Sequence, residues 1–134
     1  SIAFRDAVRL PAKETLFDSA KRSGVTIRFR GGQPAGHTAE LIYTAMQVCL
    51  NNAIQYAQAT ELTANLWECD GCCHAVIRNN GRPPERPVTE GGGLTNLRRQ
   101  IEKSGGAMTI QSAPEFALAL RIPNFGMTEE NKWL

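Results

Sequence analysis

A tight-turn signal between two alternating segments is the feature that most restricts the fold of this chain. Residues 62–69 and 72–79 each read as a strand, and Asp70-Gly71 joins them. Asp-Gly readily adopts the backbone angles of a two-residue hairpin turn, so this pattern predicts a pair of antiparallel strands. The alternation also indicates that one face of the resulting sheet is buried against other elements.

Further periodic segments predict the remaining strands of the sheet and the helices that pack on it. Alternating residues predict strands over 25–29, 108–112 and 116–122, and apolar stripes at helical spacing predict helices over 11–23, 40–57 and 94–104. Lys21 and Arg22 suit the last turn of the first helix, and Gly24 suits its cap. The order predicts an α+β fold: a two-layer α/β sandwich whose mixed sheet is covered on one face by about three helices.

Composition limits the domain organisation and the class of partner. The 134 residues, 42% of them hydrophobic, suit a single domain over 1–134, with 124–134 as a loose tail. A net charge of +2 favours neither a nucleic-acid-binding surface nor an acidic tail. No apolar run approaches the roughly 18 residues that cross a bilayer. Because the chain begins with Ser1, we expect a fragment of a longer protein, whose remainder can hold membrane segments.

The cysteine-rich run 69–74 suggests a metal or redox module as one alternative. Its order, Cys-x-x-Cys-Cys-His, breaks the haem-attachment spacing. A structural zinc site needs four ligands, and only Cys49 and the distant His37 remain to complete one. The favoured interpretation is reduced thiols on paired strands, as is usual in the cytosol.

The late part of the second helix carries one polar residue of interest. Asn52 lies one turn after Val48 and one turn before Tyr56, so helical spacing predicts that these three share a face. An amide oxygen at this position is a candidate ligand for magnesium, which prefers hard oxygen donors. The alternative is an ordinary surface or capping amide.

Two further segments have groups that suit a nucleotide. Asn79 ends a strand and can offer a carbonyl to an adenine amino group, while Gly81 allows a base to lie close to the backbone. Residues 91–93 are consecutive glycines before Leu94 starts a helix, and exposed N–H groups at a helix start favour a phosphate. The alternatives are an Asn-Gly turn and a flexible linker.

The order and spacing of these segments carry a family resemblance. Asn52-Ala53, Asn79-Asn80-Gly81 and Gly91-Gly92-Gly93-Leu94 resemble the N box, G1 box and G2 box of the GHKL superfamily, which includes histidine kinases, certain chaperones and type II topoisomerases. The flanking residues 81–84, 90–99, 105–106 and 114–118 are similar to those of bacterial sensor histidine kinases with a short nucleotide lid. The resemblance covers about residues 16–123.

This resemblance implies a Bergerat-type fold that holds ATP between the sheet and the lid. Asn52 would be the catalytic residue that binds magnesium, and Tyr56 would lie near the phosphates. Asn79 would read the adenine, with Gly81 beneath the base. The implied phosphate-side residues are Gly91, Gly92, Gly93 and Leu94, with Arg98 and Arg99 as candidate charge partners.

The implied activity is that of a two-component sensor histidine kinase. The domain would transfer the γ-phosphate of ATP to a histidine on an upstream dimerisation domain, and a response regulator would be the next partner. Neither His37 nor His74 has the neighbours of an acceptor histidine. We therefore expect a monomeric cytoplasmic domain here, taken from a homodimer anchored in the bacterial inner membrane.

Two positions depart from the family pattern. Asn79 stands where the family has Asp, which keeps a carbonyl but loses the charge. Val48 stands where the family has Glu, and valine cannot accept a proton. We expect binding of ATP and magnesium with slow phosphotransfer. The alternatives are a degenerate nucleotide-binding or docking module with weak or no kinase activity, and an anti-sigma-factor-type serine kinase.

Overall fold

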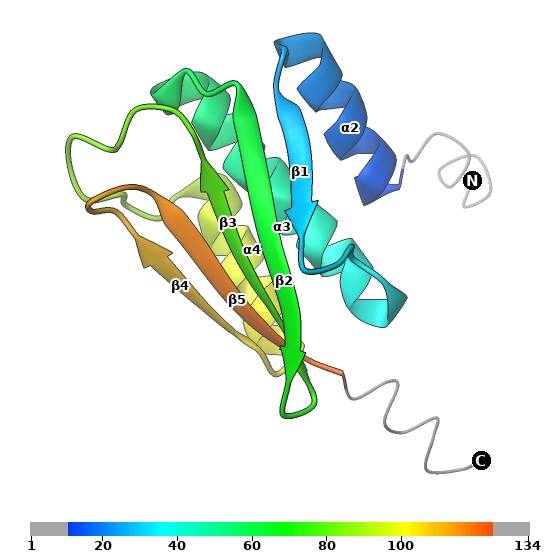
Figure 1. Cartoon of the computed structure of the whole chain (residues 1–134). Coiled ribbons are helices and arrows are strands. Elements are labelled where there is room, and N and C mark those ends of the chain that lie inside the picture. Colours follow the sequence, from blue (N-terminus) through cyan, green and yellow to red (C-terminus); the bar gives the residue numbers. More distant parts are fainter. Residues whose placement is uncertain (1–10, 125–134) are drawn as a thin grey trace, which may run out of the picture.

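The computed structural model describes residues 11–124, and its elements follow the predicted order (Figure 1). The helices are α2 (Ala12–Ser23), α3 (Ala39–Asn52) and α4 (Gly92–Lys103), with a short 3-10 turn η1 (Gly36–Thr38) before α3 and a π-helical turn η2 (Ala53–Ala57) after it. The strands are β1 (Thr26–Arg30), β2 (Glu61–Cys69), β3 (Cys72–Asn79), β4 (Ala107–Gln111) and β5 (Ala117–Pro123).

The strands described between residues 11 and 124 form one five-stranded sheet in the order β1-β2-β3-β5-β4. β1 is parallel to β2, and all other pairs are antiparallel. The predicted hairpin is confirmed: Cys69 pairs with Cys72, and the turn residues Asp70 and Gly71 have φ angles of 53° and 74°. The sheet is therefore mixed, as predicted.

The helices of the described region lie together on one face of this sheet (Figure 1). Alternate residues of the strands, such as Leu62, Ile77 and Leu118, point into the interface and are fully buried. They pack in one cluster with buried helix residues, among them Leu16, Ile42, Met46, Leu50, Leu97 and Ile101. The predicted two-layer α/β sandwich is confirmed. None of the helices between residues 11 and 124 is long and apolar enough to span a bilayer.

The observed helix boundaries match the predicted ones closely for α2 and less closely for α3 and α4. Gly24 caps α2 in the left-handed conformation, with φ at 71°, as predicted. The predicted helix over 40–57 is α-helical only to Asn52, and the following turn widens into η2 before Gln58 ends it. α4 begins at Gly92 rather than Leu94, because the Gly91 carbonyl already accepts hydrogen bonds from the Leu94 N–H at 3.0 Å and the Thr95 N–H at 3.5 Å. Gly92 within this turn has a φ of 37°, which residues other than glycine rarely adopt.

The predicted tail over 124–134 lies outside the described residues except for Asn124. The backbone N–H of Asn124 donates to the Gly71 carbonyl at 2.9 Å. The end of β5 is thereby attached to the turn of the β2–β3 hairpin.

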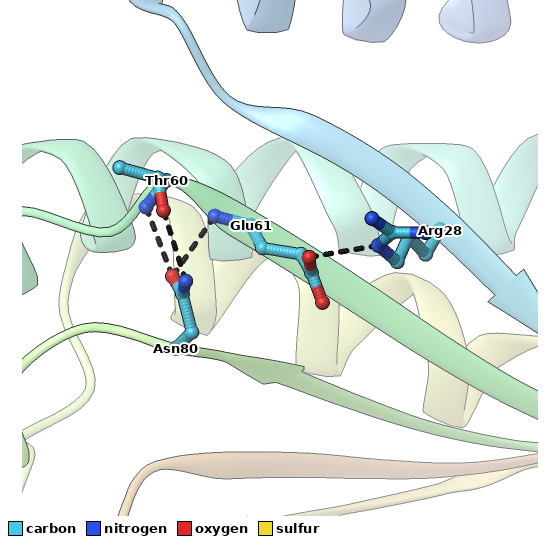
Figure 2. A network of polar contacts seen from close by, with 4 residues as sticks. All are labelled: Arg28, Thr60, Glu61 and Asn80. Carbon is cyan, nitrogen blue, oxygen red and sulfur yellow. Dashed lines mark hydrogen bonds and ion pairs between the residues drawn. The ribbon is translucent and has the colours of Figure 1, made fainter.

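Asn80 ties together the segments that enter β2 and leave β3 (Figure 2). Its Oδ1 accepts hydrogen bonds from the backbone N–H groups of Thr60 and Glu61, each at 2.9 Å, and its Nδ2 donates to Thr60 Oγ1 at 2.9 Å. Glu61 also pairs with Arg28 of β1 at 2.7 Å. This network holds the start of β2 to the end of β3.

Candidate functional site

A cavity of about 960 Å³ lies between the end of α3, the segment that follows β3 and the start of α4. Its size falls within the roughly 300–1,000 Å³ of typical small-molecule sites. It joins three segments that are distant in sequence. The sequence-predicted residues that line it are Val48, Asn52, Tyr56, Asn79, Gly91, Gly93 and Leu94, whereas Gly81 and Gly92 belong to the same segments without lining it.

One wall comes from α3 and η2. Val48, Asn52 and Tyr56 all line the cavity, as the helical spacing predicts. Asn52 is half-buried, and among the described contacts no hydrogen bond engages its side-chain amide, so its oxygen is free to accept a ligand. Tyr56 is 68% exposed on the widened turn. A π-helical turn redirects side chains and frequently occurs at functional sites.

The floor of the site is the end of β3 and the turn after it. Asn79 Oδ1 accepts a hydrogen bond from the Gly81 N–H at 2.8 Å. A side chain at Gly81 would collide with the carbonyl of Ala57, and its Cβ would lie 2.7 Å from Ala57 Cβ. Arg82 N–H donates to that same carbonyl at 2.8 Å. The structure therefore gives Gly81 a packing role against η2, which the sequence pattern did not reveal.

The opposite wall is the start of α4. Gly91 precedes the helix in an extended conformation, and no side chain caps the first turn. The N-terminal amides of a helix lack intrahelical acceptors and carry the positive end of its dipole, so this end suits an anion. A Cβ at Gly93 would lie 3.4 Å from Val48 Cγ1, which places the start of α4 directly beside α3. The two walls are in contact at Val48.

Val48 puts an apolar side chain where a carboxylate was expected from the resemblance. The carboxylates among the residues that line the cavity belong to Glu85 and Glu90, in the segment before α4. Glu90 is held in an ion pair with Arg98, with Arg98 Nε 2.8 Å from Oε1. No acidic residue of α3 therefore reaches this described cavity.

The expectation that Arg98 and Arg99 are charge partners is not supported by their positions, since neither lines the cavity. Besides pairing with Glu90, Arg98 donates from Nη1 to the Met108 carbonyl at 2.7 Å. The hydrogen bond to Glu90 raises the pKa of Arg98. Arg99 donates to Asn96 on the outside of α4. A pair of neighbouring basic residues does not show which face of a helix each side chain takes, so a charge-partner role for Arg98 and Arg99 stays a prediction.

Sequence reasoning missed the cations that do line the cavity. Arg82 and Arg86 lie in the Pro-rich segment between β3 and α4 and contribute to the cavity lining. Arg82 stands directly after Gly81 in the run Gly81-Arg82-Pro83-Pro84. The position of Arg82 directly after Gly81, in a segment already assigned to the site, was the signal in the sequence that could have identified it.

The cysteine-rich run does not form a metal centre. Cys73 is buried in the core, whereas Cys69 is exposed at the hairpin end. His74 stacks on Trp67 with ring centroids 5.2 Å apart, and His37 lies 3.3 Å from the Pro123 carbonyl. Within residues 11–124 no group of three or more His, Cys, Asp or Glu side chains converges on one point.

The fold of the chain is similar to that of solved histidine kinase structures. The histidine kinase domain of the Erythrobacter litoralis EL346 blue-light activated histidine kinase has a TM-score of 0.60 at 16% identity, covering 90% of this chain and 64% of that one. Acinetobacter baumannii histidine kinase AdeS has a TM-score of 0.64 at 15% identity, covering 84% and 60%. The catalytic domain of histidine kinase ThkA has a TM-score of 0.61 at 18% identity, covering 84% and 88%. The chain has the fold of a histidine kinase catalytic domain.

Sequence similarity points to sensor histidine kinases in particular. The chain is 30% identical over 84 residues to the signal transduction histidine-protein kinase/phosphatase UhpB of Salmonella typhimurium, and 27% identical over 86 residues to the sensor histidine kinase YxjM of Bacillus subtilis. The matches cover 60% and 64% of this chain but 17% and 21% of those proteins, so the chain spans about a fifth of their length. No family model matches the chain. The resemblance inferred from the sequence motifs is confirmed.

Proposed function

We propose that this chain is the ATP-binding catalytic domain of a two-component sensor histidine kinase. It would present the γ-phosphate of ATP to a histidine on a dimerisation domain outside this chain, and a response regulator would then receive the phosphoryl group. In the full-length homodimer the domain would lie on the cytoplasmic side of the bacterial inner membrane. The observation that carries the proposal is that Asn52 lines one cavity together with Gly91 and Gly93 at the start of α4.

The groups in the cavity fit a nucleotide with its metal ion. The uncapped start of α4 offers backbone N–H groups to the phosphates, and Arg82 and Arg86 offer positive charge. The free amide oxygen of Asn52 fits magnesium, which is commonly held by few protein ligands together with phosphate oxygens and water. Magnesium would supply charge neutralisation between the phosphates.

The residues of this chain support positioning better than proton transfer. Phosphoryl transfer depends mostly on alignment and charge neutralisation, and the cavity provides cations and helix N–H groups for both. Val48 can neither accept a proton nor orient water. A positioned general base typically contributes about 10²–10⁴-fold to a rate, so we expect slow transfer.

The absence of a proton acceptor at Val48 favours a second candidate function. With Val48 and Asn79 both in the cavity, the domain can act as a degenerate module that binds nucleotide and docks on the dimerisation domain with weak or no kinase activity. Both functions include nucleotide binding, and they differ in whether the phosphoryl group is transferred to the histidine of the dimerisation domain. Phosphorylation of the intact protein separates them.

Calorimetric titration with a non-hydrolysable ATP analogue, with and without magnesium, tests the binding step. We expect wild-type chain to bind more tightly with magnesium. Loss of one charge-assisted contact of about 1.5–3 kcal/mol predicts that Asn52→Ala binds roughly tenfold or more weakly in magnesium. Asn96→Ala, on the outside of α4, is the matched control and should bind like wild type. Absence of binding by wild type, or no effect of Asn52→Ala, would overturn the proposal.

A further inference from the structure

Two cysteines face each other at the closed end of the β2–β3 hairpin. Cys69 is the last residue of β2, Cys72 is the first residue of β3, and the two are register partners across the Asp70-Gly71 turn. Directly opposed residues of an antiparallel pair point to the same face of the sheet, with Cα atoms about 4.5–5.5 Å apart. Disulfides have Cα separations of about 4.4–6.8 Å. The hairpin therefore brings these two thiols within the range in which a disulfide can form.

The two thiols have different surroundings. Cys69 is exposed, and its Sγ donates to Asp70 Oδ2 at 3.5 Å. Cys72 is half-buried, and its Sγ accepts a hydrogen bond from Arg121 Nη1 at 3.7 Å. The ion pairs described within residues 11–124 do not include Arg121, so its positive charge lies beside this sulfur without a carboxylate partner. Reactive cysteines occur in such electropositive, partly exposed surroundings, which marks Cys72 as the thiol that attacks.

The other two cysteines of the chain are withdrawn from this chemistry. Cys49 is fully buried in the core, and Cys73 is only 9% exposed. Successive residues of a strand point to opposite faces of the sheet, so Cys73 faces away from its neighbour Cys72. The register therefore selects Cys69 and Cys72 as the pair.

We propose that Cys69 and Cys72 form a redox pair that exchanges with the disulfide of a small thiol, such as glutathione disulfide. The Cys72 thiolate attacks one sulfur of glutathione disulfide, which forms a mixed disulfide and releases one glutathione thiolate. The Cys69 thiolate then attacks the Cys72 sulfur and releases the second glutathione. The two cysteine thiols are oxidised to one disulfide, and glutathione disulfide is reduced to two thiols, which take up the two protons.

The bond should be readily reversible and separate from the nucleotide cavity. Opposed Cβ atoms lie about 4.5–5.5 Å apart in an antiparallel pair and about 3.5–4.5 Å apart in a disulfide, so closure draws the hairpin end together. Strained or exposed disulfides are the labile ones. The pair lies at the opposite end of β3 from Asn79 (Figure 1), and neither cysteine lines the cavity. The inference therefore does not rest on the proposed function.

Mass spectrometry of the chain after incubation with glutathione disulfide tests the inference. The reaction is quenched with acid, and free thiols are alkylated after denaturation. Wild type should fall from four alkylated cysteines to two, with an internal disulfide in the peptide that contains Cys69 and Cys72, and excess glutathione should restore all four. Cys69→Ser should instead stop at one bound glutathione on Cys72. Adding Arg121→Gln to that variant should slow glutathione uptake about threefold or more, because the charge beside the attacking sulfur is lost.

Cys73→Ala is the matched control and should oxidise like wild type, since Cys73 faces the core. The proposal is overturned if wild type keeps four free thiols, or carries only bound glutathione, in excess glutathione disulfide. It is also overturned if Cys73→Ala loses the internal disulfide, because Cys73 would then be a member of the pair. Equal rates of glutathione uptake by Cys69→Ser and Cys72→Ser would contradict the role of Cys72 as the attacking thiol. Circular dichroism of each variant checks that it is folded.

Discussion

Replacing Gly81 by alanine should destabilise the domain through contact with η2. A Cβ at Gly81 would lie 2.7 Å from Ala57 Cβ and collide with the Ala57 carbonyl. Carbon atoms in contact prefer about 3.5–4.0 Å, so the two segments must separate by roughly 1 Å. Neither atom of Ala57 can rotate away, because both belong to the backbone or are attached directly to it.

The expected cost follows from these contacts. Overpacking of this kind typically costs about 1–3 kcal/mol, and weakening the bond from Arg82 N–H to the Ala57 carbonyl adds about 0.5–1.5 kcal/mol. We therefore expect Gly81→Ala to lose about 2–4 kcal/mol of unfolding free energy. For a domain of this size, that corresponds to a fall in Tm of roughly 10 °C.

Urea denaturation followed by circular dichroism measures this loss, with Gly91→Ala as the matched control. Gly91 has an extended φ of −156°, and a Cβ there would meet nothing within 4 Å. Its replacement should change stability by less than about 1 kcal/mol. The reasoning is refuted if Gly81→Ala is as stable as wild type, or if Gly91→Ala loses as much as Gly81→Ala.

Three other predictions concern the rate of phosphotransfer, the pH dependence of stability and the hydrogen bonds at the start of β2. In the intact protein, with a nucleotide that binds, Val48→Glu should raise transfer of a labelled γ-phosphate by about 10²–10⁴-fold; an unchanged rate would show that the missing carboxylate is not limiting. Burial raises the pKa of Cys49, so the folded thiol stays protonated when the unfolded thiol ionises above about pH 8.5. Stability should then fall by up to about 1.4 kcal/mol per pH unit above that value, and urea titrations at pH 8 and pH 10 should show a shallower fall for Cys49→Ala. Asn80→Ala removes the hydrogen bonds to Thr60 and Glu61, and should cost about 1–3 kcal/mol and speed hydrogen exchange of those two amides; unaltered exchange would contradict this role.

Local chemistry made much of the fold predictable from the sequence. The Asp70-Gly71 hairpin and the Gly24 cap depend on the φ angles of the residues themselves, and both are confirmed. The strand order was not predictable, because it depends on pairing between distant segments such as β3 and β5. Alternation shows which face of a strand is buried but not which strand lies beside it.

The candidate site was predictable in its segments and less so in its details. Three short motifs identified residues that do line one cavity. The widened turn η2 was missed because an apolar stripe reads alike in an α-helix and in one π-helical turn. Arg82 and Arg86 were missed because the path of a Pro-rich segment depends on what it packs against. The packing of Gly81 on Ala57 was missed for the same reason.

The parallel pairing of β1 with β2 has a consequence for the order in which the chain refolds. The β2–β3 hairpin joins neighbouring residues, whereas Thr26 pairs with Glu61 only after the whole of α3 has crossed between them. Loop closure makes such non-local pairing slower. Amides of the hairpin should thus gain protection before those of β1 in pulse-labelled refolding, and the wall that carries Asn52 should reach its final position only with the later phase.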